Sequence, residues 1–418
     1  MSRVLVIANN ALRKSNSNGS TLINHLSSFS VDEIITFSID SALPDKDTAI
    51  AHYKTTDKEH LKYFFKKKNL GRVIKNEELV ANNDIPVAVG KHKSIKESAL
   101  GHYIREFIWK HGKWNKEGLY NFIEEYKPTV ILYMCGRSTF MNNITLDIHN
   151  RFDIPIVIYT SEDEYFHKYS WYRVIKNSLQ RKLIKSYKAL LKETKTVICQ
   201  HDKLNRLFKE EFNVETITSM PSCSIVPSAE PIVNNDGPIM YIGNINPNRY
   251  SSLIDVSLTL SKIDKNLKLH IYSGDMTTTV RKKLSKYPNI DIKDPVSKAE
   301  VPNLMKEARL LIHVESFKKK DKVLIENAFS TKIPDSLASG VPFILYGPNY
   351  CGFVEYFNKN NTPIKYVDSI DSLEKVLDKS LNNKEYIKEL TKSELLMAVN
   401  NHNKINNSKR IYNTLVGS

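Results

Sequence analysis

The chain has 418 residues, of which 41% are hydrophobic and 26% are charged. This length exceeds one ordinary core and predicts a globular protein of two domains, each of about 200 residues. The longest early apolar run, Val4 to Ala8, is too short for an export signal, and none approaches the roughly 20 residues that span a bilayer. The net charge of +15 is spread over both halves, so it leaves nucleic acid, an anionic membrane surface and phosphorylated small molecules open as partners.

The cysteines are few and widely spaced, without a CxxC pair or a zinc-binding spacing. They are Cys135, Cys199, Cys223 and Cys351. We therefore expect reduced thiols and a cytoplasmic protein.

The first half alternates β-branched apolar runs with helical patterns. We expect strands at 3–9, 32–39, 129–135, 154–160 and 196–200, and helices at 21–29, 115–126 and 168–193. Strands that alternate with helices in this way indicate a doubly wound parallel sheet.

A proline-rich stretch at 219–238 is the best domain boundary, and the same alternation restarts after it. Strands are expected at 239–245, 267–274, 289–294, 310–316 and 342–347, whereas the last residues are helical without a strand. The predicted domains are therefore 1–222, 237–384 and a helical segment 385–418 that packs back on the first domain. Two such Rossmann-like domains place a cleft between their strand carboxyl ends, where ligands of these sheets bind.

The stretch at 329–348 reads as a loop, a short helix, a glycine stop at Gly340 and a buried strand. Ser330 or Thr331 is expected to cap the helix, which would leave the amides of Lys332 and Ile333 free to bind an anion. Lys332 adds a positive charge, and the carboxylate of Asp335 suits the two hydroxyls of a ribose. Ordinary helix capping explains the same residues without a ligand.

The loop after the first strand of the second domain carries Gly243, Asn244 and Arg249. Glycine allows close backbone approach, and arginine can bind a phosphate with two hydrogen bonds. A solvated loop arginine is the alternative interpretation of Arg249.

In this order, the segments at 241–245, 269–274, 294–316 and 330–348 resemble the nucleotide-sugar domain of GT-B-fold glycosyltransferases. The resemblance is greatest to the retaining group that builds bacterial surface polysaccharides. In that group a glutamate, seven residues and a second glutamate precede a small-residue helix ending at G-x-P. Asp335 stands at the second glutamate position, and Asn327, with Glu326 beside it, stands at the first. The resemblance covers 237–370 well and the N-terminal domain loosely.

The resemblance implies further site residues. Asn18 and Gly19 lie in a loop similar to the one that touches the acceptor or the donor phosphate in these enzymes. Glu162 and Asp163 follow a strand that ends near the reacting sugar, and we assign them, with Asn327, as catalytic candidates. An N-cap is the alternative role for Asp163. The nucleotide base is expected near Val296, and transfer is expected to retain the anomeric configuration.

A metal clamp needs two acids after a strand, and the chain offers only Asp45 to Asp47 and the segment 161–164. We expect no metal and no cofactor, because Lys332 and Arg249 supply positive charge for the leaving diphosphate.

Residues 168–195 hold nine Lys and Arg, one acid and an apolar stripe at helical spacing. This pattern suits an anionic membrane surface on the inner face of the cell membrane, or an ordinary domain helix. The aromatic segment 100–114 suits a lipid-linked acceptor.

The sequence thus predicts a glycosyltransferase that moves sugar from a nucleotide-sugar donor, expected to be a UDP-sugar, to a saccharide or lipid-linked acceptor in surface or cell-wall polysaccharide synthesis. A GT-B-fold epimerase and a basic nucleic-acid-binding protein are the alternatives. No RNA-binding, zinc or helix-turn-helix signature supports the latter, so we expect no nucleic acid as partner.

Overall fold

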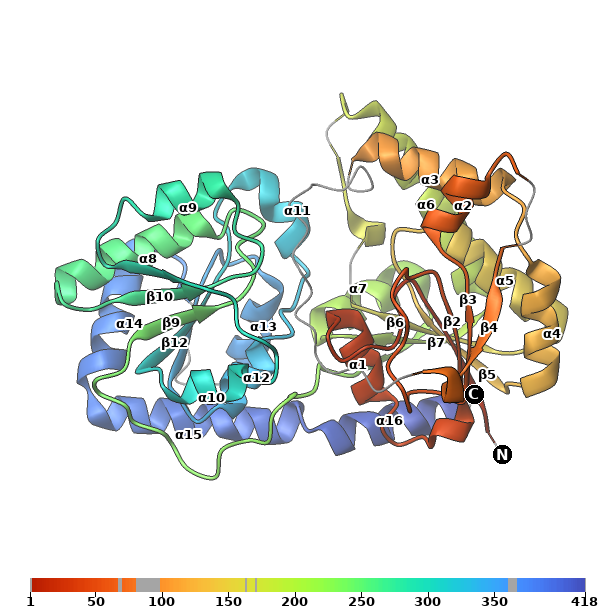
Figure 1. Ribbon diagram of the computed structural model, residues 1–418. Coiled ribbons are helices and arrows are strands. Elements are labelled where there is room, and N and C mark those ends of the chain that lie inside the picture. Colours follow the sequence, from red (N-terminus) through yellow and green to blue (C-terminus); the bar gives the residue numbers. More distant parts are fainter. Residues whose placement is uncertain are drawn as a thin grey trace. The chain divides into compact units, whose positions relative to one another are not determined.

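A computed structural model of the chain describes residues 2–66, 70–79, 98–161, 164–169, 171–359 and 367–417. Among these, the residues up to Met220 and those from Lys404 onward form one compact unit, and Pro221–Asn403 form the other. Each unit is a sheet with helices on both faces (Figure 1). The predicted fold class, two doubly wound α/β domains with C-terminal helices, is confirmed.

The first unit holds an eight-stranded sheet in the order β4-β3-β2-β1-β5-β6-β7-β8. All neighbouring strands are parallel except β3 and β4. The strands are β1 Val4–Ala8, β2 Ile34–Ser38, β3 Ala51–Lys54, β4 Arg72–Lys75, β5 Val130–Met134, β6 Ile156–Thr160, β7 Thr194–Cys199 and β8 Glu215–Thr218. The helices are α1 Ser17–His25, α2 Asp57–Tyr63, α3 Ala99–His111, α4 Lys116–Tyr126, α5 Thr139–Phe152, α6 Val174–Lys192, α7 Asp202–Phe212 and α16 Lys404–Val416.

Alternate residues of each central strand enter different cores, because successive strand side chains point to opposite faces. Leu5 and Ile7 of β1 join the core that contains Phe122 of α4 and Tyr187 of α6. Val4, Val6 and Ala8 join the opposite core, which contains residues of α1 and α16. A strand buried on both faces reads as a continuous apolar run, which explains why these strands were predictable.

The second unit holds a five-stranded parallel sheet in the order β11-β10-β9-β12-β13. Its strands are β9 Ile239–Ile242, β10 Leu269–Tyr272, β11 Ile290–Lys293, β12 Leu310–Val314 and β13 Phe343–Tyr346. Its helices are α8 Tyr250–Ile263, α9 Thr278–Leu284, α10 Val301–Lys306, α11 Lys322–Ile325, α12 Ile333–Ala338, α13 Gly352–Lys359, α14 Ile370–Asn382 and α15 Lys384–Asn401.

The C-terminal segment is divided between the two units. α15 belongs to the second unit, where the buried Glu394 accepts a hydrogen bond from the Phe343 amide at 3.0 Å. α16 belongs to the first unit, where Ile411 and Leu415 enter the core beside α1. The chain crosses between the units once after Met220, inside the predicted boundary segment, and again after Asn403.

Several elements of the structure were not predicted, among them the helices α2, α5 and α7. β3, β4 and β8 were missed, because they are short and mix polar with apolar residues. In β3 the buried His52 binds Thr36 at 2.7 Å, so a polar residue fills a core position. The helix predicted at 168–193 begins only at Val174, and Trp171 and Tyr172 before it are exposed and do not pack on the core.

Candidate functional site

The predicted donor-binding residues gather at the carboxyl ends of the second sheet. The strand order reverses between β9 and β12, which makes this the switch point where ligands of such sheets bind. The loop after β9 carries Gly243, Asn244 and Arg249, and Glu315 follows β12 directly. Lys332 and Asp335 lie at the start of α12.

Arg249 is bound to Glu315 by two hydrogen bonds, from Nε to Oε2 at 2.9 Å and from Nη2 to Oε1 at 2.6 Å. Its Nη1 donates to the carbonyls of Asn246 and Asn244 at 2.8 and 3.3 Å. Burial raises the pKa of the Glu315 carboxyl, but Arg249 and His313 outweigh it and lower this pKa to about 2. Arg249 is therefore held in place by Glu315. This arrangement does not match the expectation that its guanidinium binds a phosphate with two hydrogen bonds.

The Lys332 side chain lies against the backbone of Gly243. A Cβ added to Gly243 would stand 3.3 Å from both Cδ and Cε of Lys332, so glycine permits this close approach. Burial, and then repulsion from Arg249, lower the pKa of the Lys332 ammonium to about 8. Among the described residues, no carboxylate lies within ion-pair distance of this ammonium, so its charge is available to an anion.

The predicted cap of α12 is wrong. The cap residue is Lys332, without a side-chain hydrogen bond, and Pro334 is the second helical residue. The amide of Ile333 donates to the Ser330 carbonyl at 3.1 Å, and the Lys332 amide points to the Ser330 hydroxyl at 3.4 Å. These amides are used within the loop, so the positive charge of this segment comes from the Lys332 side chain. Gly340 has a φ of 79°, as its predicted stop role requires.

The Asp335 side chain binds the backbone of the segment that follows Met220, where the chain passes from the first unit to the second. Its Oδ1 accepts a hydrogen bond from the Ser224 amide at 2.5 Å. Burial raises the pKa of this carboxyl despite hydrogen bonds from the backbone of Ser224 and Ile225. The carboxylate is thus engaged with its own chain at the place where the sequence predicts a ribose.

The other predicted donor residues lie around this group. Val296 is half-buried in the loop after β11, and Lys298 of the same loop acts electrostatically on both Lys332 and Asp335. Ser330 and Thr331 are half-buried in the loop before α12, and Asn327 is buried between α11 and that loop. Asn244 is exposed, and its carbonyl accepts from Arg249.

A cavity of about 390 Å³ lies at the corresponding switch point of the first sheet, where β1 and β5 end. Arg137 in this cavity forms an ion pair with the buried Glu164, and His167 lies 3.3 Å from the same carboxylate. Burial raises the pKa of Glu164, but His167 and Arg137 outweigh it and lower this pKa. Arg137 was not predicted, although its place just after the strand 129–135 was the available signal.

Asn18 lines this cavity, and its Nδ2 donates to Asn10 at 3.2 Å. Gly19 has a packing role, because a Cβ there would stand 2.6 Å from the Ala11 carbonyl. The amides of Asn18 and Gly19 both donate to the Asn16 side chain, so they do not face a phosphate. The catalytic candidates Glu162 and Asp163 lie outside the described residues, next to Ser161 and Glu164 of the cavity wall.

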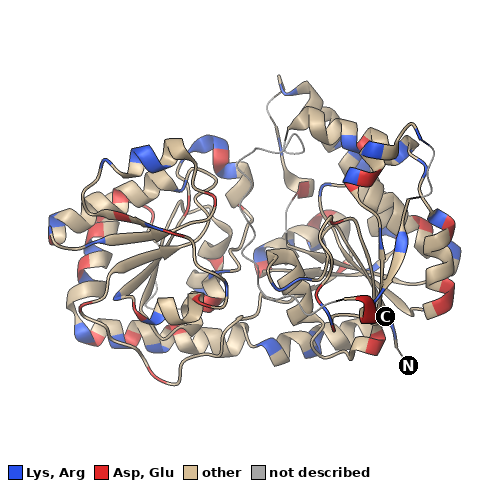
Figure 2. Cartoon of the chain, in the orientation of Figure 1, with Lys and Arg blue, Asp and Glu red and all other residues tan. Residues whose placement is uncertain are grey.

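The described residues contain no group of three or more His, Cys, Asp or Glu side chains that could hold a metal ion. The four cysteines are buried thiols that form no disulfide. None of the helices in the described ranges is long and apolar enough to cross a membrane. Figure 2 marks the positions of Lys and Arg in blue, and they occur on helices of both units.

No protein-family model and no curated protein matches the chain. Solved structures do. Sucrose-phosphate synthase from Thermosynechococcus elongatus is 9% identical, with a TM-score of 0.61 and full coverage of both chains. HepE from Anabaena, in complex with UDP and glucose, is 9% identical with a TM-score of 0.62 over the whole of both chains. The chain has the GT-B fold. The trehalose 6-phosphate synthase from Burkholderia multivorans is 8% identical, with a TM-score of 0.60. The match covers 100% of this chain and 97% of that chain. The GT-B fold thus spans the entire chain.

Proposed function

We propose that this GT-B protein is a glycosyltransferase that moves a sugar from a UDP-sugar to a saccharide or lipid-linked saccharide acceptor. We place it in the synthesis of surface or cell-wall polysaccharide, with retention of configuration and without a metal ion. The observation that carries the proposal is the Lys332 ammonium, which lies against Gly243 at the switch point of the second sheet and has no acidic partner among the described residues.

The donor diphosphate would pair with Lys332. Arg249 is held beside it by Glu315 and adds positive potential without moving. A cation fixed in place before the reaction stabilises the charge that develops on the leaving group. The sugar bond to the diphosphate breaks, the bond from the sugar to the acceptor oxygen forms, and the acceptor proton passes to the departing phosphate.

We assign the remaining roles as the sequence suggests them. Asp335 binds the ribose and Val296 lies by the base, whereas Asn244, Ser330 and Thr331 contact the donor. Glu162, Asp163 and Asn327 act near the reacting sugar. One of the similar structures, HepE from Anabaena, is a complex with UDP and glucose, which supports a UDP-linked donor for this chain.

A peripheral position on an anionic membrane is part of the proposal. Just before α6, Trp171 is 88% exposed and Val174 at its start is 68% exposed, among the lysines and arginines of this segment. Exposed aromatic and aliphatic side chains beside cations are typical of surfaces that lie at a membrane interface. Flotation with anionic liposomes should therefore fall when Trp171 and Val174 are both replaced by Ser, and unchanged flotation would oppose this part.

Calorimetry with UDP and GDP tests the donor site. Lys332→Ala should weaken UDP binding about 10- to 100-fold, the loss expected for one charge-assisted hydrogen bond. Asp335→Ala should weaken it as well. Lys262→Ala is the matched control, because Lys262 pairs with Glu374 on the exposed end of α8. Equal UDP binding by the wild type and all three variants would refute the donor site.

Incubation with UDP-sugars then separates the alternatives. A transferase yields a glycosylated acceptor, whereas an epimerase yields a changed UDP-sugar without one. Salt-sensitive binding to DNA at sub-micromolar concentration, with no response to nucleotide sugars, would instead favour a nucleic-acid-binding protein.

A further inference from the structure

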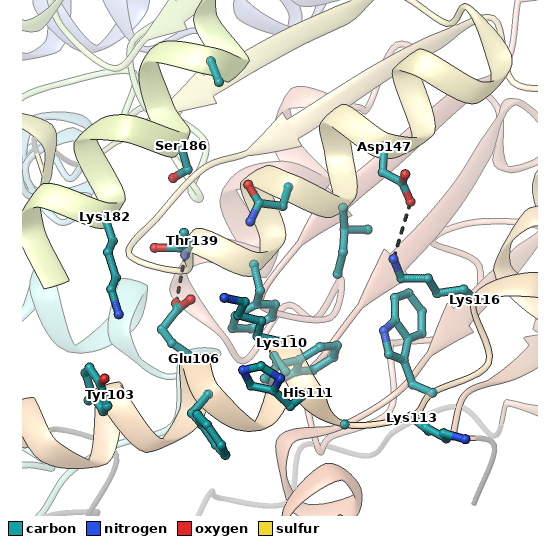
Figure 3. A pocket seen from close by; sticks show the side chains of 18 of the residues that line it. Tyr103, Glu106, Lys110, His111, Lys113, Lys116, Thr139, Asp147, Lys182 and Ser186 are labelled. Atoms are coloured by element: carbon teal, nitrogen blue, oxygen red, sulfur yellow. Dashed lines mark hydrogen bonds and ion pairs between the residues drawn. The ribbon is translucent and has the colours of Figure 1, made fainter. Parts of the chain in front are cut away.

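A second and larger cavity, of about 1160 Å³, lies in the first unit among α3, α5, α6 and the segment that joins α3 to α4. Figure 3 looks into it: Glu106 and Lys110 come from α3, Lys182 from α6, and Thr139 from the start of α5. Its volume is sufficient for a ligand of substantial size.

Helices α3 and α6 separate this cavity from the smaller one at the sheet switch point. On α3, His102 and Arg105 line the smaller cavity, whereas Glu106 and Lys110 line the larger. On α6, Lys176 and Gln180 line the smaller cavity and Lys182, Lys185 and Ser186 the larger. The large cavity is therefore distinct from the smaller one, and residues of the segment 100–114, which the sequence suggests for a lipid-linked acceptor, line it.

The walls of the large cavity are aromatic. The ring of Trp109 stacks on Phe140 with centroids 4.4 Å apart and the planes 6° from parallel. Trp114 packs edge-on against Trp109 at 6.0 Å. Tyr103 and Phe107 are 40% and 50% exposed and form part of the rim. Trp109 and Trp114 are only 4% and 9% exposed, so the aromatic surface offered to an apolar ligand is chiefly that of Tyr103 and Phe107 at the rim.

Positive charge surrounds these walls. Lys110, Lys182 and Lys185 line the cavity, and no acidic side chain of the described residues lies within ion-pair distance of any of them. Lys182 lies over the Tyr103 ring at 4.7 Å. Of the three acids that line the cavity, Glu117 is exposed, Asp147 pairs with Lys116 at 3.7 Å, and Glu106 accepts a hydrogen bond from the Thr139 amide at 2.9 Å. The three lysines are thus left for an anion from outside the chain.

The surroundings indicate where such a ligand comes from. Leu100 and Ile104 on α3 are 58% and 43% exposed, close in sequence to the rim residues Tyr103 and Phe107. Exposed aliphatic side chains that continue into an aromatic, lysine-lined cavity are complementary to an amphiphile with an anionic head.

We propose that the large cavity binds a phosphate group carried on an apolar chain, that is, a phosphorylated lipid. The phosphate lies against Lys110, Lys182 and Lys185, and the first part of the chain lies along the aromatic walls and rim. A nucleic acid would match the lysines but not the apolar walls. The use of this site for a lipid-linked acceptor rests on the proposed function, whereas lipid binding itself does not.

Intrinsic fluorescence gives a direct test, because two of the three tryptophans, Trp109 and Trp114, line the cavity. In the full chain with Trp171→Phe, titration with dodecyl phosphate below its micelle concentration should produce a saturable blue shift. Dodecyl maltoside and inorganic phosphate, each lacking one half of the ligand, should not produce it. Equal shifts with dodecyl maltoside, or none with dodecyl phosphate, would overturn the proposal.

Variants then locate the binding. Joint replacement of Lys110, Lys182 and Lys185 by Ser should weaken dodecyl phosphate binding at least about tenfold. Lys188→Ser, on the same helix but outside the cavity, should leave it unchanged. Glu106→Gln removes a negative charge from the cavity and should tighten binding at pH 8, which provides a gain that a damaged fold cannot mimic. Unchanged affinity in both the triple variant and Glu106→Gln would refute the site.

UDP calorimetry on the triple variant separates the two proposals. Normal UDP binding with lost lipid binding supports both sites. If the wild type binds dodecyl phosphate but not UDP, the donor site is refuted and the lipid site is not. Displacement of dodecyl phosphate by a single-stranded oligonucleotide at equal charge concentration would count against the lipid.

Discussion

The Arg249 guanidinium and the Glu315 carboxylate, 66 residues apart in the chain, are joined by two hydrogen bonds at 2.9 and 2.6 Å. The pair ties the loop after β9 to the end of β12, across the switch point of the second sheet. Both side chains are largely buried, and His313 adds a contact at 3.1 Å to the same carboxylate. The proposed donor site thus contains an internal ion pair, and the Lys332 side chain lies against Gly243 in the loop after β9.

Loss of one partner of this pair should be costly. Glu315→Gln leaves Arg249 buried and uncompensated, and should destabilise the protein by about 3–5 kcal/mol. The change is measured as a lower urea midpoint of unfolding. Glu374→Gln removes the partner of Lys262 in an exposed pair and should cost less than about 1 kcal/mol. Similar midpoints for the two variants would contradict the structural role of Glu315.

Binding of UDP should weaken as the pH rises above 8. Burial, and then Arg249, lower the pKa of Lys332 to about 8, so its charge is present below that pH and is lost above it. The second pKa of a terminal phosphate is about 6, so above about pH 7.5 the diphosphate of UDP is almost fully ionised and the change reports the protein. Dissociation constants measured from pH 6.5 to 9.5 should rise for the wild type. Lys332→Arg, which stays protonated throughout, should abolish this rise, and a persistent rise would assign the titration to another group.

The first unit should lose stability as the pH rises, because the buried Glu106 carboxyl then becomes charged. Burial raises the pKa of its carboxyl to about 7 from an ordinary value of 4.5. The raised pKa means that the stability associated with the protonated carboxyl is complete below pH 4.5 and is lost as the pH rises through 7. The loss is at most about 3 kcal/mol. Urea unfolding at pH 5 and 8.5 should show Glu106→Gln more stable than the wild type only at pH 8.5. Glu117→Gln, at an exposed position of α4, should not differ from the wild type.

Two glycine substitutions should separate binding from stability. Gly243→Ala places a methyl group 3.3 Å from Lys332 carbons, so it should displace that flexible side chain and weaken UDP binding about 3- to 10-fold with little change in stability. Gly340→Ala puts a side chain at a φ of 79° and 2.6 Å from Ser228, so it should destabilise by about 1–3 kcal/mol. Calorimetry and thermal unfolding of both variants check this. If Gly243→Ala lowers stability and Gly340→Ala weakens UDP binding instead, Lys332 does not have the role proposed for it.

Much of the fold was predictable because it depends on local pattern. β1 and β5 are buried on both faces, and each therefore appears in the sequence as an uninterrupted apolar run. β3 and β8 contain polar residues whose partners lie elsewhere in the chain, so pattern alone did not mark them as strands. Gly340 was predicted from its local role and has the expected positive φ.

The sequence by itself determined two doubly wound domains, the strand ends where ligands bind, and the residue set that includes Gly243, Arg249 and Lys332. Only the tertiary structure decided how those residues are used. It pairs Arg249 with Glu315, directs the Asp335 carboxylate to the Ser224 amide and uses the Ile333 amide within its own loop. The physical reason is that apolar periodicity is a property of neighbours in the chain. The partner of a buried charge is set by which strand ends the sheet brings together.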